Sequence, residues 1–206
     1  MKFKALFLLI TLSLFLLITS CKSLSKLTIE GYPNEKISKD NYTELNGLYL
    51  NQFDTITGAL KHSPGHGTFD VLNEQTITSL VFWAIPEQVL KTDSGQRIKP
   101  EHISVKIEFE SHKKAIVSMY KKDTLILSKS IRGKFKNGYF YLRPNFFIIP
   151  LFPLIYGHHF QRTRIGKTGH NLTIDYTINT FFIFVLGGGF NKGYASSIHN
   201  NTTFTH

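Results

Sequence analysis

The chain has 206 residues, with 24 Lys and Arg against 14 Asp and Glu, and a formal net charge of +10. This length accommodates one domain with a substantial hydrophobic core. The presence of a single cysteine excludes an internal disulfide. The positive charge favours anionic partners such as acidic lipids, nucleic acids or acidic glycans.

The first 21 residues have the organisation of an export signal. Lys2 and Lys4 are basic, and an uncharged, largely apolar run occupies residues 5–20. This run is short for a membrane span, which needs roughly 20 apolar residues. It ends in the sequence LITSC at residues 17–21.

This ending resembles the lipobox of bacterial lipoprotein signal peptides. The resemblance implies that residues 1–20 are removed and that Cys21 receives diacylglycerol and a further acyl chain such as palmitate, which together give stable attachment. Lys22 follows where Asp would favour the inner membrane, so the resemblance implies the outer membrane, facing the periplasm. Export makes nucleic acid a poor candidate partner. The alternative is an ordinary signal peptide or uncleaved anchor that happens to end in Cys.

Composition suggests how the remainder of the chain is organised. Residues 21–44 are polar and predict a lipidated N-terminus followed by a tether. A β-barrel domain is expected over residues 45–190, and a flexible tail over 191–206. Within the domain, Gly and Pro predict a loop at 57–70, and helical spacing of apolar residues predicts a short helix at 73–83.

Apolar and polar residues alternate along most of the domain, as in half-buried antiparallel strands. An Asn-Gly pair at 137–138 predicts a tight hairpin. The predicted strands cover residues 45–51, 102–110, 115–120, 124–132, 139–143, 158–165, 172–178 and 180–186. Short turns between them favour a mainly β antiparallel meander that closes as an eight-stranded up-and-down barrel with one short helix.

This strand order, with Asn46-Gly47-Leu48-Tyr49 on the first strand, resembles lipocalin-like β-barrel lipoproteins. Lipocalins carry Gly-x-Trp at this point, and here Tyr49 stands in the Trp position. The resemblance implies carriage of a small hydrophobic ligand, without assigning residues to it.

Residues 144–157 contain three prolines and a long apolar run, so they predict neither a regular helix nor a central strand. Three interpretations stay open: a plug at one end of the barrel, the mouth of a ligand pocket, or a contact with membrane or protein. Nearby arginines would suit an anionic head group beside an apolar tail, and Arg162 and Arg164 share one strand face. The predicted ligand-binding residues are Phe147, Phe152, Arg143, Arg162 and Arg164.

Motifs for enzymatic chemistry are missing from the sequence. It contains no GxSxG, SxxK or HExxH pattern, and its histidines lack the spacing of a zinc site. The sequence therefore predicts a non-enzymatic membrane-anchored lipoprotein, without cofactor or metal, that binds a small amphiphile or lipid in a barrel. The alternative is a structural or assembly lipoprotein that binds an envelope protein through the apolar loop or a sheet edge.

Overall fold

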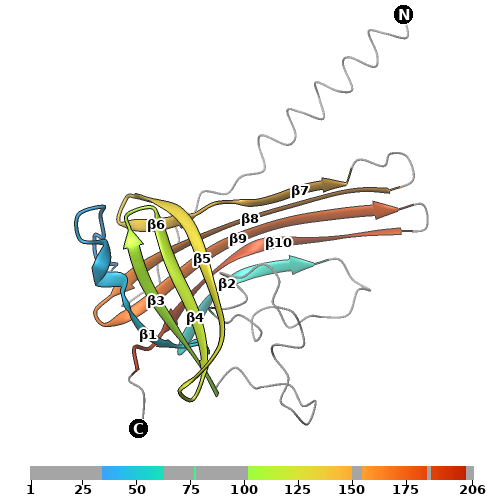
Figure 1. Cartoon of the computed structure of the whole chain (residues 1–206). Coiled ribbons are helices and arrows are strands. Elements are labelled where there is room, and N and C mark those ends of the chain that lie inside the picture. Colours follow the sequence, from blue (N-terminus) through green and yellow to red (C-terminus); the bar gives the residue numbers. More distant parts are fainter. Residues whose placement is uncertain (1–33, 63–76, 78–101, 150–154, 185–186, 203–206) are drawn as a thin grey trace, which may run out of the picture.

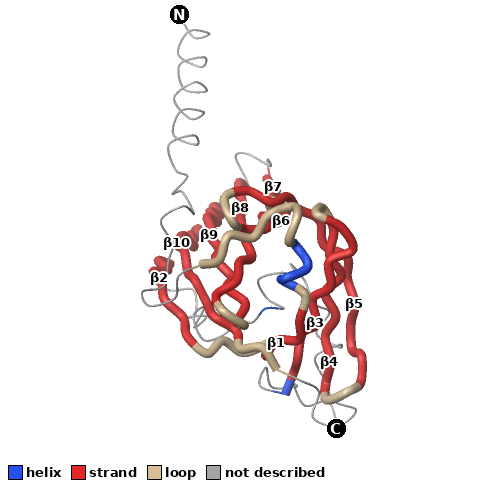
Figure 2. Tube along the Cα trace, turned by 90° about the vertical axis from the view of Figure 1, so that its left-hand side faces the viewer, coloured by secondary structure: helices blue, strands red, loops and turns tan. Residues whose placement is uncertain are grey.

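The computed structural model describes residues 34–62, 77, 102–149, 155–184 and 187–202. These residues form one antiparallel sheet of ten strands that curls into an open half-barrel (Figures 1 and 2). The prediction of a mainly β, antiparallel domain is confirmed. The eight-stranded closed barrel is wrong, because the sheet has ten strands and the first and last strands of its order, which are the first two described strands of the chain, do not pair with each other.

The strands differ greatly in length, and the longest ones extend beyond the curled part. In chain order the elements are the 3-10 helix η2 (Tyr42–Leu45), β1 (Gly47–Leu50), β2 (Thr55–His62), β3 (Ile103–Ser111), β4 (Lys114–Lys121), β5 (Thr124–Lys136), β6 (Tyr139–Leu142), β7 (Asn145–Ile149), β8 (Ile155–Thr168), β9 (Asn171–Phe184) and β10 (Gly187–His199). The sheet order is β1-β3-β4-β5-β6-β8-β9-β10-β2, and β7 pairs with β8.

The curled part has a filled interior, because inward residues of its strands are apolar. Val105, Ile107, Val117 and Met119 are fully buried there. Aromatic rings fill the space beside them, and Phe109 meets Phe140 edge-on at 4.9 Å between ring centroids. Such close packing leaves the curled part stabilised as an ordinary hydrophobic core.

Beyond the core, β8, β9 and β10 continue as a flat extension with β7 at its edge (Figure 1). We call this extension, namely β7 with residues 155–163, 177–184 and 187–194, the projecting sheet. The two strands predicted at 172–178 and 180–186 are one continuous strand, β9, which pairs with β8 from Ile155↔Phe184 to Thr168↔Asn171. Continuous pairing of two fourteen-residue strands carries the sheet away from the core.

Two strands lie where the sequence predicts irregular structure. β10 reaches His199, although a flexible tail is expected from residue 191, and β2 occupies part of the loop expected at 57–70. The glycine-rich start of β10 lacks the alternation of apolar and polar residues that predicts a strand. Hydrogen bonds to β9 on one side and β2 on the other hold β10 in the sheet instead. Gly58 is required in β2 because a Cβ there would strike the backbone of Tyr194.

The N-terminal part of the described chain packs on the half-barrel, whereas the sequence predicts a tether up to residue 44. Ile37 is buried and forms an isolated bridge with Gly138. The helix expected at 73–83 lies outside the described residues except for Ile77, which is buried and donates its N–H to the Asn51 carbonyl. Within the described ranges no helix has the length and apolar character needed to cross a membrane.

Candidate functional site

The strand register divides the side chains of the projecting sheet between two faces. Ile165 of β8 pairs with Ile174 of β9, and both lie in the core. Because side chains alternate along a strand, every second residue from this pair lies on the face continuous with the core, which we call the inner face. Phe147 and Phe182 belong to the inner face. The opposite, outer face carries residues such as Phe146.

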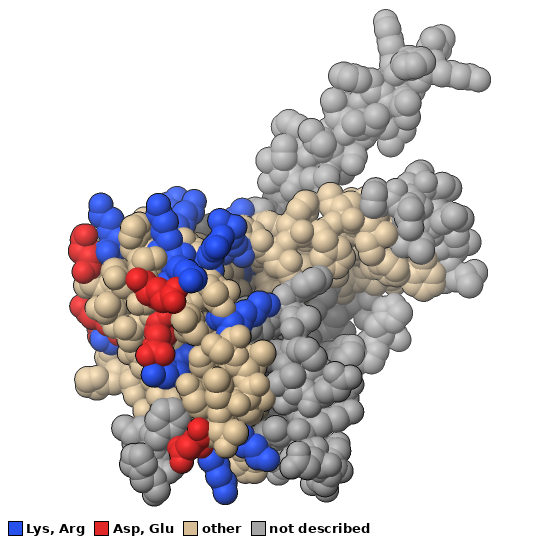
Figure 3. Space-filling view, viewed as in Figure 1, with Lys and Arg blue, Asp and Glu red and all other residues tan. Residues whose placement is uncertain are grey.

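Large apolar side chains are exposed on the outer face at the end of the projecting sheet. The exposed fractions are 58% for Phe146, 46% for Ile148, 46% for Ile183 and 45% for Phe190. They come from three strands, β7, β9 and β10, so they form one surface rather than isolated exposures. Figure 3 shows that Lys, Arg, Asp and Glu gather over the half-barrel and leave the projecting part uncharged in this view.

The inner face combines aromatic rings with polar groups. His159 is buried, its Nδ1 lies 2.8 Å from Thr180 Oγ1, and the Phe147 ring stacks on it at 5.2 Å between centroids. Burial lowers the pKa of His159 against the opposing effect of its hydrogen bond with Gln161. Burial thus favours the neutral form of the imidazole, whose surroundings are largely shielded from water.

Asn145 places an amide at the start of β7 on this inner face. It pairs with Gln161 and lies two residues before Phe147 on the same side of the strand. Its Nδ2 is buried and has no hydrogen-bond partner in the part of the chain that the structure describes. A buried amide donor without an acceptor costs about 1–3 kcal/mol, so an acceptor oxygen from a bound molecule would relieve this cost.

The predicted arginines have different surroundings. Arg162 is exposed on the outer face with its guanidinium 4.8 Å from the centre of the Phe160 ring. Arg143 lies just after β6, where its backbone N–H donates to the Arg132 carbonyl and its side chain is exposed. Both cations remain accessible to an anionic partner.

Arg164, in contrast, is buried in a network on the outer side of the half-barrel. Its Nε donates to Asp175 Oδ2 at 2.6 Å, its Nη1 donates to the Tyr141 hydroxyl at 3.3 Å, and its guanidinium lies 3.8 Å from the centre of the Tyr139 ring. Ser196 donates to the second oxygen of Asp175. Burial lowers the pKa of Arg164, but the charge and hydrogen bonds of its neighbours outweigh this effect and raise it. The guanidinium thus serves the internal ion pair.

The structure therefore separates residues that the sequence groups together. Phe147 lies on the inner face and Arg162 on the outer face, so one small ligand does not contact both. Cys21 and Phe152 lie outside the described residues. Sequence reasoning pointed to the apolar run at 144–157 but did not name Asn145 or Phe146 as site residues, because the flanking prolines hide the short strand β7 within that run.

Comparisons with known proteins add no relative. No protein-family model, curated protein or solved structure matches this chain. Among the described residues, no three His, Cys, Asp or Glu side chains come together as a metal-binding group.

Proposed function

We propose that the chain is a non-enzymatic lipoprotein of the bacterial outer membrane, anchored through Cys21, that binds a small amphiphile on the inner face of the projecting sheet. The lipobox-like sequence at residues 17–21 supports the anchor. The arrangement of aromatic and polar groups on the inner face supports the binding role.

The filled core argues for the projecting sheet over the barrel interior as the binding location. Inward side chains of β3 and β4 are fully buried against one another, as Val105, Ile107, Val117 and Met119 illustrate. Insertion of an acyl chain there would require large rearrangement of a close-packed core. On the projecting sheet, Phe147 and Phe184 are each 36% exposed and offer apolar surface without such a rearrangement.

The observation that carries the proposal is that the Phe147 ring and the Asn145 amide lie on the same face of β7. An amphiphile would lay its apolar tail along Phe147, Phe182 and Phe184, and its head-group oxygen would accept from Asn145 Nδ2. Ligand sites of this kind are mostly apolar with a few polar groups that orient the ligand.

Native mass spectrometry of the full mature chain in mild detergent, with added lysophosphatidylglycerol, tests the binding role. We expect a one-to-one adduct, about fivefold weaker binding after Asn145→Ala because one hydrogen bond is lost, and a larger loss after Phe147→Ala. Leu125→Ala is the control, because Leu125 is 53% exposed on β5, away from the inner face. Unchanged binding in both inner-face variants would contradict the assignment.

Replacement of Cys21 by Ala tests the anchor separately. Loss of palmitate labelling and release of the chain from membranes are expected, since Cys21 is the only thiol available for lipid attachment. Membrane retention with no change in lipid labelling would contradict the lipoprotein assignment.

A second candidate function is that of an assembly lipoprotein that binds an envelope protein through β7. Within the described strands β7 pairs with β8 alone, so its other edge offers backbone hydrogen-bonding groups. The strand also lacks the Lys and Pro residues that usually protect a sheet edge. Photo-crosslinking from Ile149 in intact envelopes distinguishes the two functions, since a discrete protein adduct supports the assembly role.

A further inference from the structure

Basic side chains border the exposed apolar residues of the outer face. Residues 124–202 contain nine Lys and Arg and a single acidic residue, Asp175. Asp175 is buried with Arg164, so it does not offset the charge of the surface. Lys129 and Lys167 pair in register with core residues, and Lys167 also forms ion pairs with Glu35 and Glu44. The cations on the outer side of β5–β10 give that side a positive potential.

The registers show which cations point outward. Lys134 and Lys136 pair with Tyr141 and Tyr139, which lie on the side opposite the core residue Phe140. Both lysines are exposed, as are Arg143 and Arg162. In the described part of the chain none of these four makes an ion pair with an acidic side chain.

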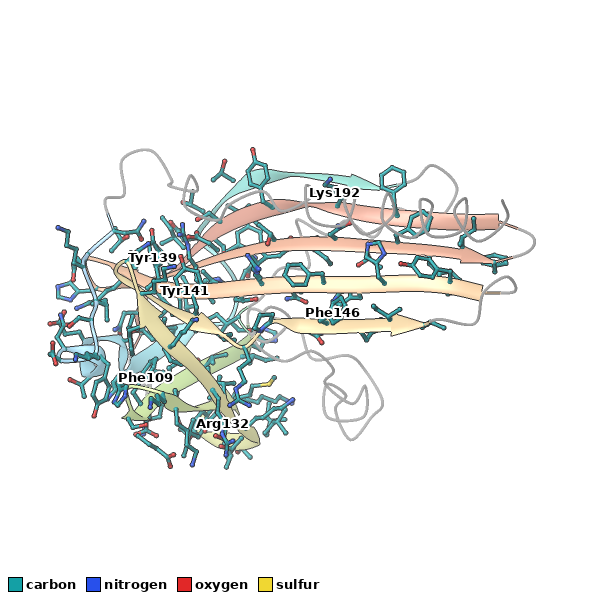
Figure 4. All side chains as sticks on the ribbon, turned by 90° about the horizontal axis from the view of Figure 1, so that it is seen from above. Phe109, Arg132, Tyr139, Tyr141, Phe146 and Lys192 are labelled. Atoms are coloured by element: carbon teal, nitrogen blue, oxygen red, sulfur yellow. The ribbon has the colours of Figure 1, made fainter. Side chains whose placement is uncertain are left out.

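Along the outer face, exposed apolar side chains give way to basic ones with distance from the free end. Ile183 lies nearest the free end, and Ile148 and Phe190 share the next row. Phe146 pairs with Phe160 in the row after that, which also contains Lys192, and Arg162 lies over the Phe160 ring. Figure 4 shows Phe146 on β7 of the projecting sheet and Arg132 on β5 of the half-barrel. An apolar end, an aromatic zone and a basic zone in this order match the layers of an anionic bilayer surface.

The position of Asn34 connects this face to the proposed anchor. Thr173 Oγ1 donates to Asn34 Oδ1 at 2.9 Å, and Thr173 lies on the outer side because its neighbours Leu172 and Ile174 are core residues. Twelve residues lie between Cys21 and Asn34. Fully extended, this segment spans roughly 45 Å, so a lipidated Cys21 keeps Asn34 and the outer side of the half-barrel beside it within that distance of the bilayer.

We propose that the outer face docks on an anionic lipid bilayer, with Phe146, Ile148, Ile183 and Phe190 in the acyl-chain boundary and Arg162 among the phosphates. This inference rests on the anchor in the proposed function, and it is independent of ligand binding on the inner face. Lipid attachment and a basic apolar surface are two membrane signals that reinforce one another, because the first raises the effective concentration of the second.

Environment-sensitive labels on the lipidated mature chain test this orientation. Phe146→Cys and Leu125→Cys are each labelled with a nitrobenzoxadiazole maleimide and reconstituted into vesicles of phosphatidylcholine and phosphatidylglycerol that contain nitroxide-labelled lipid. A lipidated Cys21 has no free thiol, so each variant carries one label. We expect strong quenching and a blue shift at position 146. The label at position 125 should remain in water.

A charge variant tests the role of Arg162. Because one basic residue near an anionic membrane is worth about a fivefold change in binding, Arg162→Gln should lower the docking equilibrium constant about fivefold on these vesicles. On pure phosphatidylcholine the substitution should have no effect. Equal loss on both kinds of vesicle would overturn the assigned phosphate contact.

The outcomes separate failure of docking from failure of the anchor. A lipidated chain whose label at position 146 remains in water overturns docking alone. A second label on Cys21 overturns the anchor and the docking proposal together. A blue shift that depends on protein concentration, and not on lipid, identifies the face as an interface between copies of this chain and overturns docking on lipid.

Discussion

At the scale of single residues, the buried Arg164–Asp175 pair shows how surroundings decide the role of a charge. Arg162 and Arg164 are two residues apart on one strand face, yet one is exposed and the other is buried beside Asp175. Burial raises the pKa of Asp175, and the charge of Arg164 and the hydrogen bond from Ser196 oppose this effect. Removing either partner would leave a buried charge without compensation.

Asp175→Ala should therefore lower the free energy of unfolding by about 3–5 kcal/mol, measured by urea denaturation. Glu108→Ala is the matched control, because the Lys106–Glu108 pair lies at the surface and is worth at most about 1 kcal/mol. If Asp175→Ala does not fold, the double variant Arg164→Met/Asp175→Leu should restore much of the stability. An effect of Asp175→Ala as small as that of the control would contradict the assigned role.

At the scale of elements, the β5–β6 hairpin follows directly from two residues. Asn137 and Gly138 have φ angles of 52° and 84°, which the Asn-Gly pair adopts more easily than other sequences. Gly138 also forms an isolated β-bridge with Ile37, so this turn connects the hairpin to the N-terminal segment.

Gly138→Ala should destabilise the protein by about 1 kcal/mol, because a side chain at positive φ is strained. Thermal unfolding measures the effect. Gly187→Ala serves as the control, since the nearest atom to its Cβ would be Phe184 Cζ at 3.7 Å, an ordinary contact. Equal melting temperatures for the two variants would show that the turn does not need glycine.

At the scale of the whole molecule, His199 lies where the two ends of the sheet path approach each other. Leu50 donates to the Asn200 carbonyl at 2.9 Å, and Thr202 donates to the Leu48 carbonyl at 2.8 Å. His199 is buried between these segments, with Nδ1 3.2 Å from the Leu50 carbonyl and Nε2 3.0 Å from Ser197 Oγ. Because a carbonyl can only accept, Nδ1 donates to Leu50, and in the neutral ring Nε2 is then the acceptor facing the Ser197 hydroxyl.

The contacts of His199 with these segments should weaken in acid. Burial lowers the pKa of His199 from 6.5 to about 4, so between these values the unfolded chain takes up a proton that the folded chain refuses. Stability present above pH 6.5 is thus lost as the pH falls toward 4, by about 3 kcal/mol. Urea denaturation at pH 7 and pH 4.5 should show a smaller loss in His199→Gln than in the natural chain. His112→Gln, at an exposed turn, should show the natural loss; equal losses in all three would contradict the prediction.

Patterns among neighbouring residues in the sequence were sufficient to predict the regular strands. The alternation of apolar and polar residues by itself places Val105 and Ile107 inward, and the Asn137-Gly138 pair identifies its turn, because both signals depend on neighbours along the chain. The lipobox-like segment before Cys21 is equally local, and it lies outside the described residues.

Sequence by itself determined that the domain is mainly β, antiparallel and built on an apolar core. Tertiary structure alone decided that β10 is a strand, that β7 separates Phe146 and Phe147 between two faces, and that Arg164 is buried while Arg162 is exposed. The physical reason is that these outcomes depend on pairing between distant strands. The glycine-rich strand β10 is ordered because β9 and β2 hydrogen-bond to its backbone on both sides. Arg164 is buried because Asp175 of the neighbouring strand pairs with its charge.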